Sequence, residues 1–405
     1  MPIETDSVLR VCVAGLGGFA AAHHRALRRL EEEGLCRVVA ACDPLMDLDE
    51  DMAARGIRLY RDLETLLGAE SGNLDLLTLP VPVPLHRPMH EMAVRHGVAC
   101  YLEKPPTLWW PEYLEMLEVE DRAARKTQVG FNFVIDPMRR RLKARILSGE
   151  FGKLLGATFV GYWPRHRSYY ERASWAGRIR LGDRWVLDNP IGNAMAHYVQ
   201  NALFMCGGAV DAVAEVEAVR ATLQRYRRIE SFDTVFLEAQ LTGGPWLRIA
   251  ASHACRGEHR NEETIVMEDA AVRIDTSHTA TIVRRDGSKE TLAAVWPGTE
   301  ESLLANLRHY LACLQGQHPR PITTLGDCRG FVSLIDLAFL SVDQIEDRSD
   351  GTDPEWVEAP ERARELDAFI EKGMGVSEAR WAGMERLSGL QAHLESLKAA
   401  SRPVS

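Results

Sequence analysis

The chain has 405 residues, which favours two domains because one hydrophobic core seldom grows to that size. Charged residues make up 26% and hydrophobic residues 46% of the chain, the balance of a globular protein in water. The formal net charge of −10 argues against nucleic acid as the main partner, and no apolar run approaches the ~20 residues of a membrane-spanning helix.

The N-terminal sequence MPIETDSVLR has no basic segment followed by an apolar stretch, so we expect no secretory signal and a cytoplasmic protein. The eight cysteines are scattered along the chain and form no close CxxC pair. This spacing predicts reduced thiols rather than disulfides or a zinc site, and we expect no bound metal.

Strand-like and helix-like segments alternate over the first 128 residues. Short apolar runs predict buried strands at 8–14, 37–43, 74–80, 98–105 and 127–133. Helical composition separates them, at 20–33, 47–55, 86–97 and 112–126. Such alternation with short links is typical of a parallel, doubly wound sheet, so we predict an α/β dinucleotide-binding domain at 1–128.

The pattern changes after about residue 150. Longer strand-like runs occur at 154–163, 209–223, 233–243, 245–254, 263–276 and 280–287. The tight turns Gly243-Gly244 and Asp286-Gly287 separate some of them. We predict an α+β domain at 129–348 with a large, mostly antiparallel open sheet and helices at 301–316 and 329–346. The charged, alanine-rich residues 349–405 predict a helical C-terminal extension.

The segment VAGLGGFAAAHH contains the spacing Gly15-x-Gly17-x-x-Ala20 between the first strand and the first helix. The first glycine permits a tight turn, the second lets the backbone approach a pyrophosphate, and a small third residue lets helix and strand pack closely. The amides at the helix N-terminus can then bind phosphate. A purely structural glycine turn is the alternative, which the strand-turn-helix context disfavours.

Asp43 ends the second predicted strand. An acidic side chain there can accept hydrogen bonds from the adenosine ribose and would repel a 2′-phosphate. The next basic residue along the chain is Arg55, so the sequence favours NAD over NADP. A carboxylate that caps the helix after Pro44 is the alternative, and the two roles are compatible.

Lys104 lies in Glu103-Lys104-Pro105-Pro106, where the fourth predicted strand ends. Ligands of parallel sheets bind at that edge, and a lysine there can donate a hydrogen bond to a substrate oxygen or help to remove its proton. From spacing alone, a surface lysine in a proline-rich turn is the more common case.

The segment 187–207 holds Asp188, Asn193 and His197 near the start of a predicted helix. Asn193 and His197 are four residues apart and would share a helix face. A histidine there can serve as general acid or base, because its pKa lies near neutrality. The alternative is a helix-face histidine bound to a neighbouring side chain.

The segment 162–185 is rich in arginine and aromatic residues. Aromatic faces suit sugar rings and arginine forks suit carboxylates or phosphates, so we hypothesise a loop that binds an acidic or extended carbohydrate through Tyr169, Arg172 and Trp175. A subunit interface is the alternative, because interfaces are enriched in the same residues. The basic run 139–145 is interpreted as a solvated helix face.

Together these motifs resemble the Gfo/Idh/MocA oxidoreductase family. The resemblance covers roughly residues 8–345 and rests on VAGLGGFAAAHH, the strand end at Asp43, PVPLH, YLEKPPT and GFNFVIDPMRRRLKARILSGEFGKL. It implies a Rossmann domain, a second domain whose open sheet often serves oligomerisation, and NAD(P)-dependent chemistry on sugars or inositols. The cofactor contacts that it implies are Gly15, Gly17, Gly18, Phe19, Asp43, His86, Glu103 and Lys104.

The resemblance also suggests roles in catalysis. Lys104 matches the lysine that contacts the reacting hydroxyl, and His197 matches the usual acid/base of an Asp-x-Gly-x-His-x-x-Asp helix. The two aspartates of that pattern fall on Asn193 and Gln200, so both acids have become amides. Asn132 and Asn193 join the candidates for substrate contact.

We therefore expect an NAD-dependent dehydrogenase or reductase acting on a carbohydrate-like secondary alcohol, with NADP less favoured. His197 would take the proton and Lys104 would stabilise the developing alkoxide. The alternatives are a redox-neutral, NAD-retaining lyase or glycosidase and a non-catalytic regulatory protein that binds the cofactor. A homodimer or homotetramer is expected.

Overall fold

The computed structural model describes residues 8–255, 259–296, 298–349, 351–357, 360–374 and 380–400. The chain forms two compact units. The first comprises Met1–Thr107, Pro111–Asp136 and Trp296–Cys328, and the second comprises Leu108–Trp110, Pro137–Val295 and Arg329–Ser405. The chain therefore returns to its first unit after most of the second unit has been formed.

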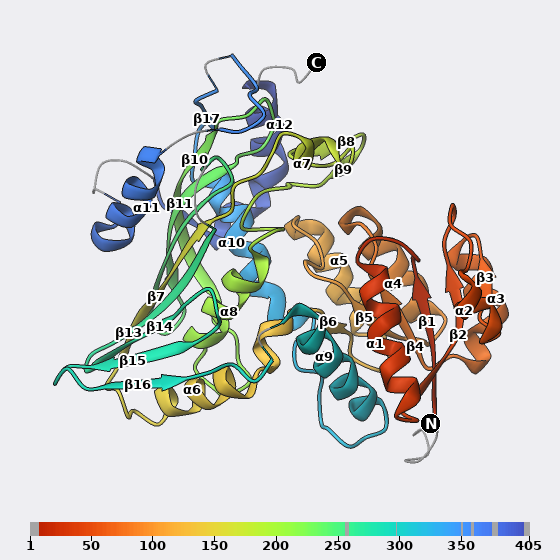
Figure 1. Ribbon diagram of the computed structural model, residues 1–405. Coiled ribbons are helices and arrows are strands. Elements are labelled where there is room, and N and C mark those ends of the chain that lie inside the picture. The colour runs from red at the N-terminus through yellow and green to blue at the C-terminus, as the bar shows by residue number, and fades with distance from the viewer. Residues whose placement is uncertain are drawn as a thin grey trace. The chain divides into compact units, whose positions relative to one another are not determined.

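The first unit is built on a six-stranded parallel sheet. Its strands are β1 (Leu9–Ala14), β2 (Cys36–Cys42), β3 (Arg58–Tyr60), β4 (Leu76–Leu79), β5 (Ala99–Leu102) and β6 (Gln128–Val129). Their order is β3-β2-β1-β4-β5-β6, so the strand order reverses between β1 and β4 (Figure 1). A ligand of a doubly wound sheet binds beyond the carboxyl ends of the strands at such a reversal. The predicted Rossmann architecture is confirmed.

The helices of the first unit include the four predicted there and also Leu63–Glu70, which the sequence analysis did not predict. They are α1 (Ala20–Glu32), α2 (Glu50–Ala54), α3 (Leu63–Glu70), α4 (His86–Arg95), α5 (Trp110–Glu120) and α9 (Thr299–Leu314). Short 3-10 turns occur at Ser71–Asn73, Val83–Leu85, Asn132–Ile135 and Gly326–Cys328. The predicted strand at 127–133 is only two residues long, because the chain turns at Asn132 after β6.

Helix α9 differs from the domain division drawn from the sequence, which placed residues 296–328 in the second domain. Its apolar residues Leu303, Leu307 and Leu311 pack in one core with Leu27 and Leu30 of α1. Burial of these side chains, worth roughly 1.5–3 kcal/mol each, is the physical reason for the return of the chain to the first unit.

The second unit contains a ten-stranded sheet. Its strands are β7 (Leu154–Tyr162), β10 (Val216–Arg225), β11 (Thr234–Leu241), β12 (Trp246–Ser252), β13 (Arg260–Met267), β14 (Ala270–Ile274), β15 (Ala280–Arg284), β16 (Lys289–Leu292), β17 (Glu346–Asp347) and β18 (Ala382–Gly383). The order is β16-β15-β14-β13-β7-β12-β11-β10-β17, and β18 pairs with β10. Only the β7–β12 and β10–β17 pairs are parallel, so the predicted mostly antiparallel sheet is confirmed.

Other elements of the second unit surround this sheet. The helices are α6 (Pro137–Leu147), α7 (Ser168–Glu171), α8 (Ala196–Cys206), α10 (Arg329–Leu340), α11 (Pro360–Lys372) and α12 (Leu390–Ala400), with a 3-10 segment at Met384–Gly389. A small hairpin joins β8 (Arg180–Leu181) to β9 (Arg184–Trp185). The run 263–276, predicted as one strand, is two, because the chain turns between β13 and β14.

Both faces of the large sheet are covered near β7, as Figure 1 shows for α8 on one side and α11 on the other. Phe159 stacks on Tyr198 of α8 with ring centroids 4.9 Å apart. Its neighbour Val160 packs with Leu366 and Phe369 of α11. Successive strand residues point to opposite faces, so α8 and α11 lie on opposite sides of the sheet.

The basic run 139–145 corrects an interpretation made from the sequence. Arg139 is 1% exposed and Lys143 is 0% exposed, so these two basic residues do not belong to a solvated helix face, whereas Arg141 of the same run is exposed. Arg139 forms a two-pronged ion pair with buried Glu263 at 2.8 and 3.1 Å, and the Lys143 ammonium donates to the carbonyl of Ala212. These partners come from distant parts of the chain, which the local composition does not reveal.

Within the described residues, no helix is long and apolar enough to cross a membrane. The eight cysteines are all buried and none of them is in a disulfide.

Candidate functional site

The loop between β1 and α1 has the backbone that a dinucleotide site requires. The amide of Gly15 donates to the carbonyl of Cys42 at 2.7 Å, which ties the loop to the end of β2. Gly15 has a φ of +101°, and a Cβ there would lie 3.1 Å from the Cβ of Ala20. A side chain at this position is therefore disfavoured both by conformation and by the close approach of α1.

The amides that follow Gly15 point to a ligand. Within the described chain, the backbone N–H groups of Gly17, Gly18 and Phe19 donate to no protein acceptor, whereas that of Leu16 donates to Asp43. They lie at the start of the 13-residue helix α1, whose dipole also favours an anion. This arrangement fits the pyrophosphate of a dinucleotide.

Asp43, 9% exposed, follows β2 at the same edge of the sheet. Its carboxylate accepts amide hydrogen bonds from Leu16 at 3.0 Å, Leu45 at 2.9 Å and Met46 at 2.8 Å. Burial opposes ionisation, but these three amides outweigh it and lower the pKa of Asp43 below its ordinary value. Asp43 thus closes the following turn, but it caps no helix after Pro44, because α2 begins only at Glu50 with Asp49 as its N-cap. Its Oδ2 atom has a single amide donor and keeps acceptor capacity for a ribose hydroxyl.

Arg61 lies beside this carboxylate although it is distant in sequence. Its guanidinium donates to the carbonyls of Asp43 at 3.3 Å and Met46 at 2.7 Å, and it pairs with Asp47. Arg61 lies 18 residues after Asp43 in the chain, too far for a local sequence pattern to reveal that the two are neighbours. Pairing with Asp47 offsets the charge of Arg61, so the basis for preferring NAD is retained.

The turn that carries Lys104 is held by its neighbours. Glu103 lies 3.0 Å from the Nε2 atom of buried His23 and accepts the Lys104 amide at 3.2 Å. The His86 nitrogens face the carbonyls of Pro105 at 2.8 Å and Val81 at 2.9 Å. Burial lowers the pKa of His86, although the two carbonyls favour the protonated ring, and the ring lies between the turn and the loop after β4. The structure gives Glu103 and His86 positioning roles, and their cofactor contacts stay predictions.

Asn132 is buried, with 1% of its surface exposed. Its side-chain oxygen accepts a hydrogen bond from Tyr101 at 3.1 Å, and its carbonyl accepts one from Asn306 at 3.3 Å. In this structure the residue therefore holds β5 and α9 together, and substrate contact through its side chain stays a prediction.

The second unit places His197 in the first turn of α8. Asn193 precedes that helix, so the expectation of a shared helix face is wrong. Instead, the Asn193 amide donates to the carboxylate of buried Asp188 at 2.9 Å, and the other oxygen of Asp188 accepts the amide of Gly177 at 2.7 Å. Gln200, at the position of the second missing acid, is 0% exposed.

Tyr169, Arg172 and Trp175 form one cluster in the second unit. The Arg172 guanidinium lies 3.6 Å from the ring centroid of Tyr169 and 4.9 Å from that of Trp175, and it donates to the Tyr169 carbonyl. The three residues selected from the sequence are therefore close together in the structure. Stacking of this kind suits both a sugar-binding surface and a protein interface, so it leaves both interpretations open.

The chain shows a family relationship over its first unit. Residues 9–131 match the model of Gfo/Idh/MocA, an oxidoreductase family with an NAD-binding Rossmann fold. The chain is 26% identical over 344 residues to D-apiose dehydrogenase of Paraburkholderia graminis, covering 81% of this chain and 86% of that protein. It is 31% identical over 149 residues to inositol 2-dehydrogenase 4 of Saccharopolyspora erythraea, covering 36% and 43%.

Solved structures extend the likeness to both units. The WlbA dehydrogenase of Chromobacterium violaceum, solved with NADH and UDP-GlcNAcA, matches with a TM-score of 0.68 and 20% identity over 84% of this chain and 95% of that chain. UDP-N-acetylglucosamine 3-dehydrogenase GnnA of Acidithiobacillus ferrooxidans matches with a TM-score of 0.64 and 18% identity, over 82% and 97%. At these identities the likeness establishes the fold.

Proposed function

We propose that this chain, whose residues 9–131 match the model of the Gfo/Idh/MocA family of NAD-binding oxidoreductases, transfers a hydride between NAD and a secondary alcohol of a carbohydrate. The observation that carries the proposal is the loop at Gly15, where three amides have no acceptor among the described residues and the neighbouring Leu16 amide donates to the carboxylate of Asp43. The amides of Gly17, Gly18 and Phe19 would hold the pyrophosphate, and Asp43 would hold the adenosine ribose.

Two residues divide the proton chemistry in this proposal. NAD, when bound, supplies the hydride acceptor or donor. His197 takes the proton of the substrate hydroxyl, for which an imidazole is suited near neutral pH. The ammonium of Lys104 stabilises the negative charge that develops on the alcohol oxygen. Asp188 acts through Asn193, whose amide it orients near the start of α8.

The substrate class is inferred from three relatives, which act on D-apiose, an inositol and UDP-N-acetylglucosamine. A polyhydroxylated, sugar-like substrate is common to all of them. Tyr169, Arg172 and Trp175 offer aromatic faces and a guanidinium to such a molecule. This cluster supports an acidic carbohydrate, because a guanidinium pairs well with a carboxylate or phosphate.

The test is a screen of NAD with sugars, sugar acids and inositols, followed by absorbance at 340 nm. We expect Lys104→Met and His197→Ala to lower kcat at least 100-fold on the best substrate while the Kd for NADH, from fluorescence titration, changes less than threefold. Arg184→Gln, an exposed change in the hairpin of β8 and β9, is the control.

Three outcomes would contradict the proposal. Near-normal turnover in either variant removes the role given to that residue. Product formed without net NADH indicates the redox-neutral alternative. That alternative is suggested by Asn193 and Gln200, where amides replace the two acids of the family pattern. NADH binding without turnover on any substrate supports a regulatory protein instead.

A further inference from the structure

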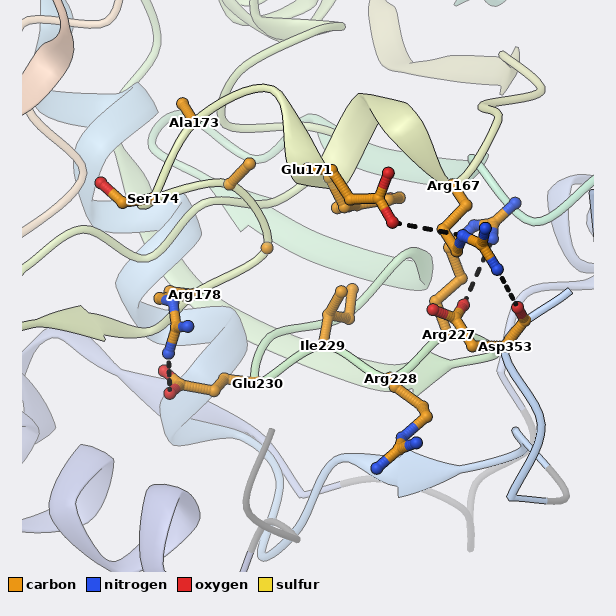
Figure 2. A pocket seen from close by; sticks show the side chains of 13 residues that line it. Arg167, Glu171, Ala173, Ser174, Arg178, Arg227, Arg228, Ile229, Glu230 and Asp353 are labelled. Atoms are coloured by element: carbon orange, nitrogen blue, oxygen red, sulfur yellow. Dashed lines mark hydrogen bonds and ion pairs between the residues drawn. The ribbon is translucent and has the colours of Figure 1, made fainter. Parts of the chain in front are cut away.

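A cavity of about 380 Å³ lies within the second unit, apart from the residues assigned above to NAD and to proton transfer. Its walls are α7 with the segment that follows, the turn between β10 and β11, and the chain at Asp353 (Figure 2). Neither Asn193 nor His197 lines it, and the residues Tyr169, Arg172 and Trp175 are not among those that line it. The volume is in the range of small-molecule sites.

The charged lining of this cavity has an excess of cations. Four arginines and three carboxylates face it: Arg167, Arg178, Arg227, Arg228, Glu171, Glu230 and Asp353. Figure 2 shows them around the same space, with Arg178 paired to Glu230 at 3.1 Å. Glu230 also accepts the amide of Ile179 at 3.1 Å, so this carboxylate joins the turn between β10 and β11 to the segment before β8.

Arg227 is the buried member of the set, with 1% of its surface exposed. Its guanidinium donates to the carbonyls of Arg165 and Pro354, each at 2.7 Å, and reaches the carboxylate of Asp353 only at 3.5 Å. Its Nε atom is buried and has no hydrogen-bond partner among the described residues. Arg227 already pairs with Asp353 and also donates to the carbonyl of Glu355 at 3.1 Å, so its Nε atom is the donor that stays unsatisfied within the described chain. An unsatisfied buried donor is costly, which favours a ligand with an acceptor oxygen in the adjoining cavity.

The remaining wall is apolar and closely packed. Ile229 and the ring of Tyr170 line it, and the Tyr170 hydroxyl is bound to His253 at 3.0 Å. Gly177 has a φ of +70°, and a Cβ there would lie 2.8 Å from Ile229 and 2.9 Å from Tyr170. An apolar wall beside arginines suits the C–H face of a sugar ring.

We propose that this cavity binds a sugar-sized anion through its arginines, which recognise the carboxylate of a sugar acid or the phosphate of a sugar phosphate. The guanidinium groups pair with the anionic group, and the wall of Tyr170 and Ile229 contacts the ring. The site is distinct from the cofactor loop and does not depend on the hydride transfer proposed above. Asp353, which lies after β17 in the C-terminal part of the chain, would thus contribute to the ligand site.

The test is calorimetric titration of the full chain saturated with NADH, so that the cofactor loop is already occupied. The probes are glucose 6-phosphate, glucuronate, inorganic phosphate and glucose. We expect at least one sugar anion to bind at least tenfold more tightly than inorganic phosphate, and glucose not to bind. Glucuronate alone identifies a carboxylate site and glucose 6-phosphate alone a phosphate site.

The variants are Arg228→Gln, at an exposed lining position, and Arg178→Gln, with Arg184→Gln as an exposed control of the same charge change outside the cavity. We expect the lining variants to weaken binding of the sugar anion at least tenfold and the control to leave it unchanged. The proposal is overturned if no sugar anion binds, if glucose binds equally well, or if the three variants behave alike.

Discussion

At the residue scale, Asp43 shows how one carboxylate can serve the fold and a ligand together. Three backbone amides bind its two oxygens, so its ionised form is stabilised before any ligand is present. The same contacts fix the loop of Gly15 against the end of β2. We therefore predict that a substitution at Asp43 affects both stability and the proposed contact with the cofactor.

Asp43→Asn is expected to weaken NADH binding at least tenfold and to lower the free energy of unfolding by about 1–3 kcal/mol at pH 7, because an amide nitrogen cannot accept. The pKa of Asp43 is lower in the folded state than in the unfolded state. Its contribution to the free energy of unfolding is therefore fully present at a pH above the unfolded-state pKa, and it is lost as the pH falls through the folded-state pKa. Urea unfolding at pH 7 and pH 3 checks this. A stability difference that is equal at both pH values would contradict it.

Asp336 of α10 has a pKa that is shifted in the opposite direction to that of Asp43. It is 0% exposed and accepts one backbone hydrogen bond, from Trp110 at 2.7 Å, and burial raises its pKa well above the ordinary value. The folded state therefore binds a proton more readily than the unfolded state, and stability is lost as the pH rises towards the folded pKa.

We predict that Asp336→Asn is more stable than the wild type at pH 8 and that its advantage shrinks as the pH falls. The slope is about 1.4 kcal/mol per pH unit between the unfolded and folded pKa values. Thermal unfolding across this range, with Asp327→Asn as the control, measures it. A pH-independent difference would show that Asp336 is ionised in the folded protein throughout.

At the scale of elements, α6 is anchored to the large sheet by buried charge. The ion pair between Arg139 and Glu263 is almost completely buried, and Asn201 of α8 also donates to Glu263. One carboxylate of β13 thus joins two helices to the sheet. Removal of one partner leaves the other charge buried without its counterion.

Glu263→Gln is expected to lower the free energy of unfolding by about 3–5 kcal/mol. The double variant Arg139→Met/Glu263→Leu should recover much of this loss, because it leaves no buried charge. Chemical denaturation of the two variants and the wild type provides the comparison. Equal destabilisation by the single and double changes would show that lost packing, rather than an unpaired charge, sets the loss.

Helix α11 covers one apolar region of the large sheet. Its residues Leu366 and Phe369 pack on Val160 and Ala250, and Asp367 pairs with Arg260 at 2.9 Å. The resemblance drawn from the sequence implied an open sheet that serves oligomerisation. In this chain a helix of the same polypeptide occupies part of that face.

We predict that Leu366→Asp detaches α11 and exposes the apolar strand residues beneath it, which increases self-association. Light scattering coupled to size exclusion compares its mass with that of the wild type and of Lys372→Ala, an exposed change at the end of the same helix. An unchanged mass at 1–100 µM protein would mean that the covered face has no tendency to associate. The wild-type mass also tests the expected homodimer or homotetramer.

At the scale of the whole molecule, the proposed NAD contacts lie in only one of the two compact units. A ligand that binds the folded state at 100 times its Kd adds about 2.7 kcal/mol to the stability of the part it binds. NADH should therefore raise the melting temperature of the transition that includes the first unit by about 5–10 °C. Differential scanning calorimetry tests this, and Asp43→Asn should reduce the shift. No shift at millimolar NADH would remove the basis of the proposed function.

Local patterns explain why much of the architecture could be predicted. The strands near Val11, Val38 and Leu76 are short apolar runs, and the loop at Gly15 needs a glycine because of its own positive φ and the nearby Ala20. Such signals depend on near neighbours in sequence. The boundary of α8 was predicted less well, since the turn that Asp188 and Asn193 hold before it is stabilised by Gly177, more than ten residues away.

Strand period, turn chemistry and the order of motifs are local properties, so the Rossmann unit, the mostly antiparallel sheet and the residues proposed to hold NAD could be predicted from them. The remaining features required the tertiary structure. It placed Arg61 beside Asp43, buried Arg139 against Glu263 and returned residues 296–328 to the first unit. It also gathered Arg167, Arg178, Arg227 and Arg228 around one cavity. Each of these outcomes depends on burial and charge pairing between residues far apart in the chain, which no local pattern encodes.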